Sequence, residues 1–544
     1  MGYTLLWLES LGAALLFLAT VAALFSRARW WRLPRVVPIL TALAMIGVTA
    51  FGTFVVGVFQ FVPFIQTTWF APVLCWSMVF TLGASALLLR ALRRGAERTT
   101  LARTWPLRKL ALGFAAVLVL SCITFANMDT AVKLQLASVR AEAGPRILAL
   151  APRRLPDSVN AAPLYLEAFE LLPPLGPTAP VWQDSNGDIR YDAATVDPRS
   201  KEFRAFIQAR QPALALLRKG AALPGYWFER DYFQGIELFP PEVKQLQHAA
   251  VLLAYGALAL AAEGKTRQAL DDVVAIFGMA HQFEEPMLVS LVVSVRIERT
   301  GLSALQDVLR LAPPTSNDLQ AISLPARERY RTILERALRM DEAMGLTCFG
   351  MLSVQPLPEA IYYLESSTSF PMQPARKKRD PVLGGILGSP LYRVFLLADD
   401  LAGYRRYMYE AEELCKQPYF EAISKMIAVE ENCRATRGGG FIARMITPSL
   451  QRVSGIVAEG EACHRLSRLG LAAKAYELKY GSSPPSIDSL TPEFLPRIPL
   501  DPFDGKPMRM KTNKAELLFY SVGINGKDDG GDGGRDIVFR LKGK

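Results

Sequence analysis

The chain has 544 residues, of which 51% are apolar and 21% are charged, with a mean hydropathy of +0.17 and a formal net charge of +11. So large an apolar fraction excludes an intrinsically disordered chain, and six cysteines in this length exclude a small disulfide scaffold. The length corresponds to roughly three or four domains.

The positive charge is concentrated near the N-terminus. Residues 1–109 hold eleven basic and two acidic residues, a net charge of +9, so the other 435 residues carry only +2. The basic residues lie in two short loops, 26–37 and 90–109, which are bounded by apolar runs of membrane-spanning length. Such a distribution is typical of the cytoplasmic loops of a membrane protein and not of a phosphate-binding groove, so we expect no nucleic-acid partner.

Residues 1–127 are predicted to form a transmembrane anchor of four helices. Each bilayer crossing needs about 20 apolar residues, and the four apolar segments cover about 4–25, 38–62, 68–89 and 110–126. Because basic loops remain in the cytoplasm, we expect both termini and the whole chain after the anchor to lie outside the cytoplasm. The lipid bilayer is an expected partner. Only Glu9 is ionisable within these segments, which disfavours a channel or transporter.

The region after the anchor is predicted to be mainly helical. Residues 128–353 form an irregular helical domain in this interpretation, and helices continue over 393–455 after a linker at 354–392 that contains six prolines. The linker also carries a basic run, Arg376–Arg379, which is typical of a solvated loop.

The clearest unit within this region predicts three consecutive helices, over Gln245–Ala262, Thr266–Phe283 and about 286–309. The apolar stretch 249–262 is too short to span a bilayer, so we expect it to be a buried core helix. The break at Glu263-Gly264-Lys265 looks like the turn of a tetratricopeptide hairpin. Because the sequence contains no second copy of this hairpin at the repeat period of about 34 residues, it predicts one repeat-like hairpin and no regular array.

The last unit, 456–544, is predicted to be a small α+β domain. Its helix is expected to end at Tyr480, where Gly481 and two prolines follow. Short strands are expected at 507–512, 516–521 and 536–541, the first two forming a hairpin. The predicted fold class is therefore mainly α, with a transmembrane anchor, a partly repeat-like helical middle domain and a small α+β C-terminal domain.

Three stretches of this last unit, taken in order, resemble a known family. They are Ala472-Ala-Lys-Ala-Tyr-Glu-Leu-Lys-Tyr-Gly, Leu495-Pro-Arg-Ile-Pro-Leu-Asp-Pro-Phe-Asp-Gly-Lys-Pro, and Phe519-Tyr-Ser-Val-Gly-Ile-Asn-Gly-Lys-Asp-Asp-Gly-Gly, closed by Asp536-Ile537. This order resembles the soluble domain of the major pseudopilin of bacterial type II secretion, over about the last 85 residues. The chain as a whole resembles bacterial multi-pass membrane proteins that end in such a domain, which implies the inner (cytoplasmic) membrane of a bacterium.

The chain also departs from the pseudopilin pattern. The helix before the domain carries charged and polar side chains, including Glu459, Glu461 and Arg465, and could not form the apolar core of a fibre. No prepilin-peptidase site precedes that helix in the sequence. The resemblance therefore implies a borrowed domain without fibre assembly.

In major pseudopilins the loop after the Tyr-Ser strand binds calcium, so the resemblance implies a calcium site here. Calcium prefers six to eight oxygen ligands, which a loop rich in aspartate and glycine provides; the candidate ligands are Asp528, Asp529, Asp532 and Asp536. Asp536 takes the place of the family's last loop aspartate, whereas Asn525 and Gly534 replace two of its acidic positions. The alternative is a metal-free acidic turn closed by Asx hydrogen bonds.

No catalytic constellation is recognisable in the sequence. It contains no nucleophile elbow, phosphate-binding loop, His-Glu-x-x-His motif or dinucleotide fingerprint, so no catalytic or cofactor-binding residue is predicted. We therefore favour a non-enzymatic scaffold that binds other envelope proteins. The alternative is an extracytoplasmic hydrolase that acts through carboxylates, with the pairs Glu284–Glu285 and Asp399–Asp400 as candidates.

Histidines and cysteines leave further alternatives open. His248 is expected in the core, and His281 shares a helical face with Glu284 and Glu285, which favours a metal only weakly without a second histidine. Four cysteines, which either form two disulfides in one of three pairings or remain buried thiols, follow the anchor: Cys348, Cys415, Cys433 and Cys463. Cys415 and Cys433 are one candidate pair.

Overall fold

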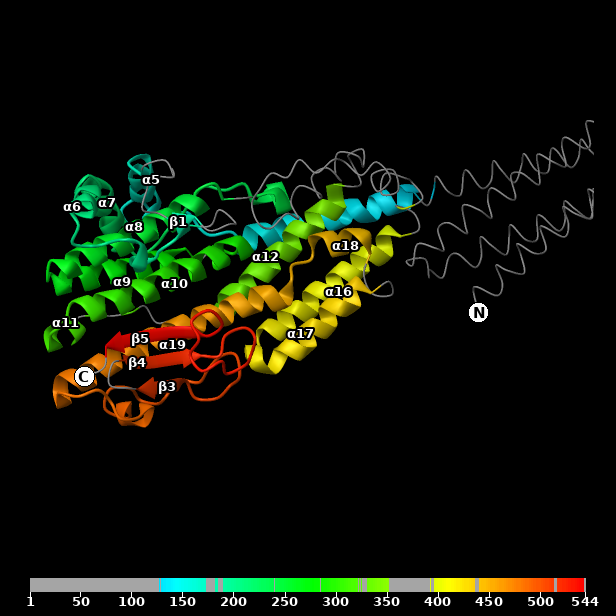
Figure 1. Cartoon of the computed structure of the whole chain (residues 1–544). Helices are drawn as coiled ribbons and strands as arrows, with labels where there is room; N and C mark the ends of the chain where they lie inside the picture. Colours follow the sequence, from blue (N-terminus) through cyan, green and yellow to red (C-terminus); the bar gives the residue numbers. More distant parts are fainter. Residues whose placement is uncertain are drawn as a thin grey trace, which may run out of the picture.

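The computed structural model describes residues 129–172, 182–183, 189–238, 240–283, 285–320, 330–351, 396–435, 440–512 and 516–542, with single residues 127, 322, 324 and 392 (Figure 1). The described chain is mainly α, with a three-stranded antiparallel sheet close to the C-terminus. The predicted transmembrane anchor and almost all of the proline-rich linker lie outside the described residues.

The first described elements are short. A helix covers residues 129–150. It is followed by α5 (Ala162–Glu170), a two-residue strand pair β1 (Trp182–Gln183) and β2 (Ile189–Arg190), α6 (Lys201–Gln208) and α7 (Gln211–Ala221). α6 is amphipathic and buries Phe203 and Ile207, and the Ser200 hydroxyl caps it by accepting the N–H of Phe203 at 3.1 Å.

The three predicted central helices are confirmed as α8 (Val243–Ala262), α9 (Thr266–Gln282) and α10 (Leu288–Leu311), which pack on one another. Among the described helices α8 alone is long and apolar enough to cross a membrane, and it is buried in the protein on nearly all of its faces. It is therefore the core helix that its length predicts.

The turn between α8 and α9 is a Schellman motif. Gly264 has φ +75°, its N–H donates to the carbonyl of Ala261 at 3.0 Å, and the N–H of Lys265 donates to that of Leu260 at 2.9 Å. Glycine adopts this left-handed conformation without the strain that a Cβ would add. The turn reverses the chain sharply and sets α9 antiparallel against α8.

Two further helices precede the linker, α11 (Ser316–Gln320) and α12 (Tyr330–Met351). Three more helices confirm that the helical pattern resumes after the linker: α16 (Leu397–Cys415), α17 (Tyr419–Arg434) and α18 (Phe441–Ile446). α12, α16, α17 and α18 enclose a core of their own with the 129–150 helix and the start of α19. In Figure 1 α16, α17 and α18 lie at the end of the body opposite α6 and α7.

The C-terminal elements confirm the predicted helix end and the three predicted strands. α19 (Leu450–Tyr480) ends at Gly481, which has φ +74°, and is followed by β3 (Arg509–Thr512), β4 (Glu516–Ser521) and β5 (Ile537–Lys542) in the sheet order β3-β4-β5. The sheet lies along α19 (Figure 1). A Cβ on Gly470 would lie 2.1 Å from the Phe539 ring, so only glycine permits this approach.

α19 joins the two cores of the molecule. Its N-terminal residues Leu450 and Val457 belong to the core of α12 and α16–α18, whereas Leu466 and Leu469 belong to a larger core that extends from Ile147 to Leu541. That larger core contains both α8–α10 and the sheet. The C-terminal module is thus packed directly onto the central helices, mainly α10.

Candidate functional site

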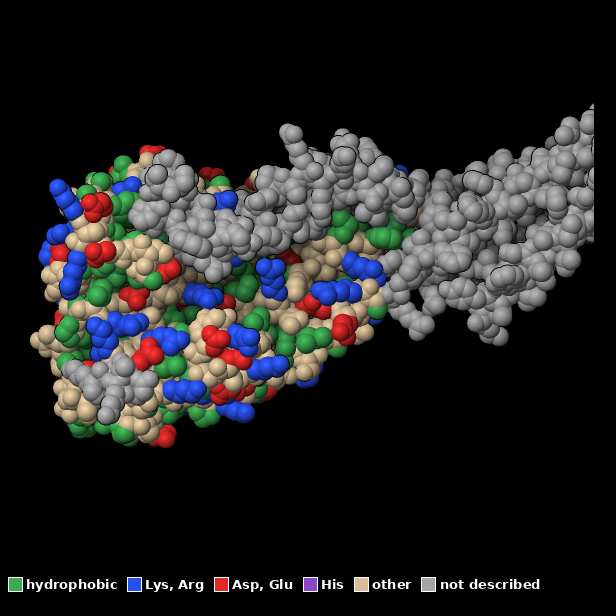
Figure 2. Space-filling view, viewed as in Figure 1, with side chains coloured by type: hydrophobic (Ala, Val, Ile, Leu, Met, Phe, Trp, Pro, Cys, Tyr) green, Lys and Arg blue, Asp and Glu red, His purple; other side chains and the backbone are tan. Residues whose placement is uncertain are grey.

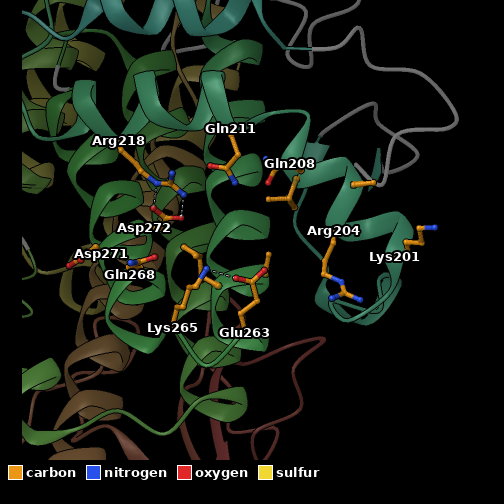
Figure 3. Close-up of a pocket in the computed structure, with 14 residues that line it drawn as sticks. Lys201, Arg204, Gln208, Gln211, Arg218, Glu263, Lys265, Gln268, Asp271 and Asp272 are labelled. Carbon is orange, nitrogen blue, oxygen red and sulfur yellow. Dashed lines mark hydrogen bonds and ion pairs between the residues drawn. The ribbon is translucent and has the colours of Figure 1, made fainter.

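A groove of about 950 Å³ lies beside α6, α7, α8 and α9 (Figure 3). Its size falls in the range of ligand-binding clefts, about 300–1,000 Å³. α6 and the start of α7 form one side, and the α8–α9 turn forms the other. The lining is rich in polar side chains: cations and amides come from α6, α7, α9 and the α8–α9 turn, and carboxylates come from that turn and α9.

One wall of the groove is fixed by a partly buried ion pair between α7 and α9. The Arg218 guanidinium donates twice to Asp272, from Nε to Oδ1 at 2.5 Å and from Nη2 to Oδ2 at 2.8 Å. Asp272 is almost fully buried, and its burial raises the pKa of the carboxyl while Arg218 lowers it in part. A bidentate pair of this kind holds the two helices in a defined orientation.

Other polar side chains of the groove have no side-chain partner in the described chain. Lys201 and Arg204 form no ion pair with any carboxylate that the structure describes, although Arg204 Nε donates to the Ser200 carbonyl at 3.4 Å. Three amide side chains likewise have no hydrogen-bond partner in the described chain, namely Gln208, Gln211 and Gln268. The groove therefore combines a fixed wall with solvent-accessible donors and acceptors that are available to a ligand.

Sequence reasoning did not identify this groove. Its residues come from four elements between positions 201 and 272, and no motif connects them. The only local signal was the polar face of the helix predicted at Thr266–Phe283, which is equally typical of a solvated surface. Figure 2 shows basic and acidic side chains interspersed over the described face, so surface charge alone does not mark the groove either.

The acidic loop between β4 and β5 is closed on itself. Asp528 accepts the N–H of Gly530 at 3.0 Å, Asp532 accepts that of Gly534 at 3.1 Å, and Asn525 accepts that of Lys527 at 3.0 Å. These are Asx turns, the geometry of the metal-free alternative.

The four candidate calcium ligands are not gathered into a single cage. Asp528 also binds Arg509 at 3.0 Å, and Asp529 binds Arg535 at 3.3 Å. Asp536 is buried; its Oδ2 accepts the N–H of Gly531 at 2.6 Å, but its Oδ1 has no hydrogen-bond partner in the described chain. Over the residues that the structure describes, no three His, Cys, Asp or Glu side chains are grouped to hold a metal. A calcium ion here would depend on backbone carbonyls together with Asp536.

The aspartate of the Leu-Asp-Pro-Phe-Asp-Gly stretch has a structural role. Asp501 is fully buried and accepts four donors: the N–H groups of Phe503 at 3.0 Å and Val522 at 2.9 Å, the Ser521 hydroxyl at 2.8 Å and Arg509 Nη1 at 3.1 Å. It ties the segment Leu495–Pro507 to the end of β4. This contact explains why an aspartate stands at that point of the motif.

The first candidate catalytic pair is not a pair of free carboxylates. Glu284 lies outside the described residues, and Glu285 is buried against Arg230, whose Nε donates to its Oε1 at 2.6 Å. Arg230 also binds the buried Glu242, to which the Tyr226 hydroxyl donates at 2.8 Å. Burial raises the pKa of Glu285, with Arg230 opposing. The cluster is enclosed by protein and links the loops that precede α8 and α10.

The second candidate pair divides between surface and interior. Asp399 is exposed, whereas Asp400 is buried and accepts the N–H groups of Ile442 and Ala443, each at 2.8 Å, together with the Tyr392 hydroxyl. Asp400 on α16 therefore caps the N-terminus of α18. Its carboxylate is fully used in joining these helices.

His248 and the four cysteines are core residues, whereas His281 is half-buried and belongs to no metal-binding group of the described residues. Burial, and then the charge of Arg210, lowers the pKa of His248 to about 4, so this histidine is neutral at physiological pH. Within the described chain all four cysteines are buried thiols, and the alternative with two disulfides is not observed.

Comparison with protein-family models, with curated proteins and with solved structures finds no match to this chain. Its function must therefore be argued from its own residues.

Proposed function

We propose that this chain is a membrane-anchored scaffold of the bacterial envelope, which binds another envelope protein through the groove beside α6–α9. The observation that carries the proposal is the set of groove side chains whose polar atoms have no partner in the described chain, Gln208, Gln211 and Gln268 among them. Accessible amides of this kind, beside a wall that the Arg218–Asp272 pair holds in place, can hydrogen-bond a ligand that enters the groove.

The membrane part of the proposal is supported by the sequence. Four apolar segments precede residue 128, and the loops between the first and second and between the third and fourth are basic. By the positive-inside rule the described body then lies outside the cytoplasm of the cell. The C-terminal module, which resembles the pseudopilin soluble domain, contributes a rigid platform because it shares a core with α8–α10.

The hydrolase alternative has no comparable support. Glu285 is held by Arg230, and Asp400 caps α18, so one carboxylate of each candidate pair is buried and bonded. A general acid or base has to reach the substrate within hydrogen-bond distance. We therefore keep the scaffold as the proposed function.

The binding proposal is tested by photocrosslinking in living cells. A photoreactive amino acid replaces Gln208 in the groove of the full-length chain, and in a matched variant it replaces Lys244, which is exposed on α8 but does not line the groove. We expect a discrete crosslinked adduct with another protein from position 208 and none from 244. The same adducts from both positions, or none from either, would contradict the proposal.

The orientation is tested by cysteine labelling of intact spheroplasts. The four described cysteines are buried, so a Lys244→Cys variant introduces an accessible thiol over a low background. A membrane-impermeant maleimide should label this variant before lysis and leave the parent chain largely unlabelled. Labelling only after lysis would refute the predicted topology.

As part of this function we also propose that the β4–β5 loop binds calcium. The supporting observations are the resemblance of the loop and the buried Oδ1 of Asp536, which has no hydrogen-bond partner in the described chain. A ligand that binds only the folded state raises the melting temperature. We expect calcium at about 1 mM to raise the Tm of the detergent-solubilised full-length chain.

Two variants control this measurement. The triple variant D529A/D532A/D536A should lose the calcium-dependent rise, whereas Asp488→Ala, an exposed aspartate outside the loop, should keep it. Calcium without effect on the parent chain would leave the loop as an Asx-bonded turn.

A further inference from the structure

The charges that line the groove do not balance within the protein. Arg218 is neutralised by Asp272, Lys265 pairs with Glu263 at 2.8 Å, and Asp271 pairs with Arg267 at 3.0 Å. Two cations remain, Lys201 and Arg204, and neither has an ion pair with a described carboxylate. They are one turn apart on α6, so both project from the same side of that helix. The groove therefore carries an excess of positive charge at the α6 side.

Lys201 and Arg204 are both exposed on α6, so the groove presents their positive charge to solvent. The N-termini of α7 and α9 add little to this field, because each lies beside the C-terminus of the preceding helix, α6 or α8, whose partial charge is opposite. Lys201 and Arg204 therefore make the groove complementary to a negatively charged ligand.

The amides of the groove indicate what kind of anion it takes. Gln208, Gln211 and Gln268 each present one carbonyl acceptor and one NH₂ donor, and none has a hydrogen-bond partner in the described chain. An extended peptide offers one N–H and one C=O per residue, which must be satisfied when it is bound, whereas a helix has already satisfied its own. In Figure 3 Gln208 and Gln211 lie on the side of the groove nearer α6, whereas Gln268 lies beside Asp271 on the opposite side.

From these contacts we infer that the groove binds an extended, acidic peptide segment of a partner protein. The amides would hydrogen-bond its backbone, and Lys201 and Arg204 would pair with its carboxylates. This inference rests on the proposed scaffold function and specifies the partner's chemistry.

The experiment measures fluorescence anisotropy of a labelled peptide of alternating glutamate and serine with the full-length chain in detergent. A matched peptide has lysine in place of glutamate. We expect the acidic peptide to bind and the basic one not to bind, with an affinity that falls as salt screens the charges. The K201E/R204E variant should bind the acidic peptide about tenfold more weakly, as expected for the loss of two exposed ion pairs and some added repulsion.

Two further variants separate charge from backbone recognition. Lys244→Glu also replaces a cation with an anion, but at an exposed position outside the groove, and should leave binding of the acidic peptide unchanged. The Q211A/Q268A variant removes two amides without changing charge and should weaken binding of the acidic peptide by about thirtyfold, from roughly 1 kcal/mol for each of two lost hydrogen bonds. All variants should keep the parent's circular-dichroism spectrum and Tm, because the residues changed are exposed or half-buried.

The outcomes distinguish this inference from the proposed function. A crosslink from position 208 without binding of the acidic peptide overturns the acidic-peptide inference and leaves the scaffold proposal standing. Equal competition by citrate or by a single-stranded oligonucleotide would mean recognition of any anion, which also overturns it. Absence of both the crosslink and peptide binding overturns both proposals.

Discussion

Replacing Arg230 by methionine should destabilise the protein more than any exposed charge substitution. The guanidinium is only 2% exposed and lies between Glu242 and Glu285, both of which are buried. Methionine keeps much of the side-chain volume but removes the positive charge. Two buried carboxylates then remain without their counterion, although Tyr226 and Ser290 still donate to them.

The magnitude follows from the desolvation of these carboxylates. Breaking a buried ion pair by removing one partner costs about 3–5 kcal/mol, because the charge that remains is neither paired nor solvated. Glu242 already has one buried oxygen, Oε2, without a partner in the described chain, so nothing nearby can compensate. We therefore expect a loss of about 3–5 kcal/mol and a fall in Tm of roughly 5 °C or more.

The pH dependence identifies the cause. Burial raises the pKa of Glu285 in the folded state above its unfolded value, with Arg230 opposing. A raised pKa favours the protonated form of Glu285 in the folded protein. The contribution of Glu285 to stability is therefore fully present at low pH and is lost as the pH rises through its folded pKa. Without Arg230 that pKa rises further. The gap in Tm between Arg230→Met and the parent should therefore be smaller at about pH 5 than at about pH 7.

The assay is thermal unfolding of the full-length chain in detergent, followed by circular dichroism at both pH values. Arg204→Met, which removes an exposed arginine, is the matched control and should change Tm little. R230M/E242Q/E285Q, which also neutralises the carboxylates, should recover part of the loss. An unchanged Tm in Arg230→Met, or a gap that grows on acidification, would refute this reasoning.

Three further substitutions test contacts that join distant parts of the chain, each by thermal unfolding. Asp400→Ala should cost about 3 kcal/mol, because it leaves two buried N–H groups of α18 without an acceptor, whereas Asp399→Ala should be close to neutral. Gly470→Ala should cost about 1–3 kcal/mol by forcing α19 away from Phe539, and a stabilised protein would contradict the packing described. Asp501→Ala should cost about 3 kcal/mol and speed proteolysis of the C-terminal module, since four donors lose their acceptor. Unaltered proteolysis would argue against the role of Asp501 in joining the segment Leu495–Pro507 to β4.

Much of the described secondary structure was predictable because its causes are local. The length of the apolar stretch 249–262 indicated a buried helix, and Gly264 and Gly481 mark helix ends because a left-handed residue stops a helix wherever it occurs. The strands near the C-terminus follow from short runs rich in apolar residues, with turn residues a few positions away. These signals are contained in short windows of sequence.

The functions of the carboxylates and the existence of the groove were not predictable in this way. In the sequence, Glu285 and Asp400 are candidate acids. In the structure, Arg230 binds Glu285 and the N–H groups at the start of α18 donate to Asp400. The polar residues of the groove, such as Arg204 and Gln268, are ordinary surface residues in a linear reading. Local signals in the sequence were enough to predict most of the described helices and the C-terminal strands, since hydrophobic period and chain reversal depend on neighbouring residues. Which charges are neutralised and which remain available to a ligand follows from the three-dimensional fold, because it depends on partners brought together from distant positions in the chain.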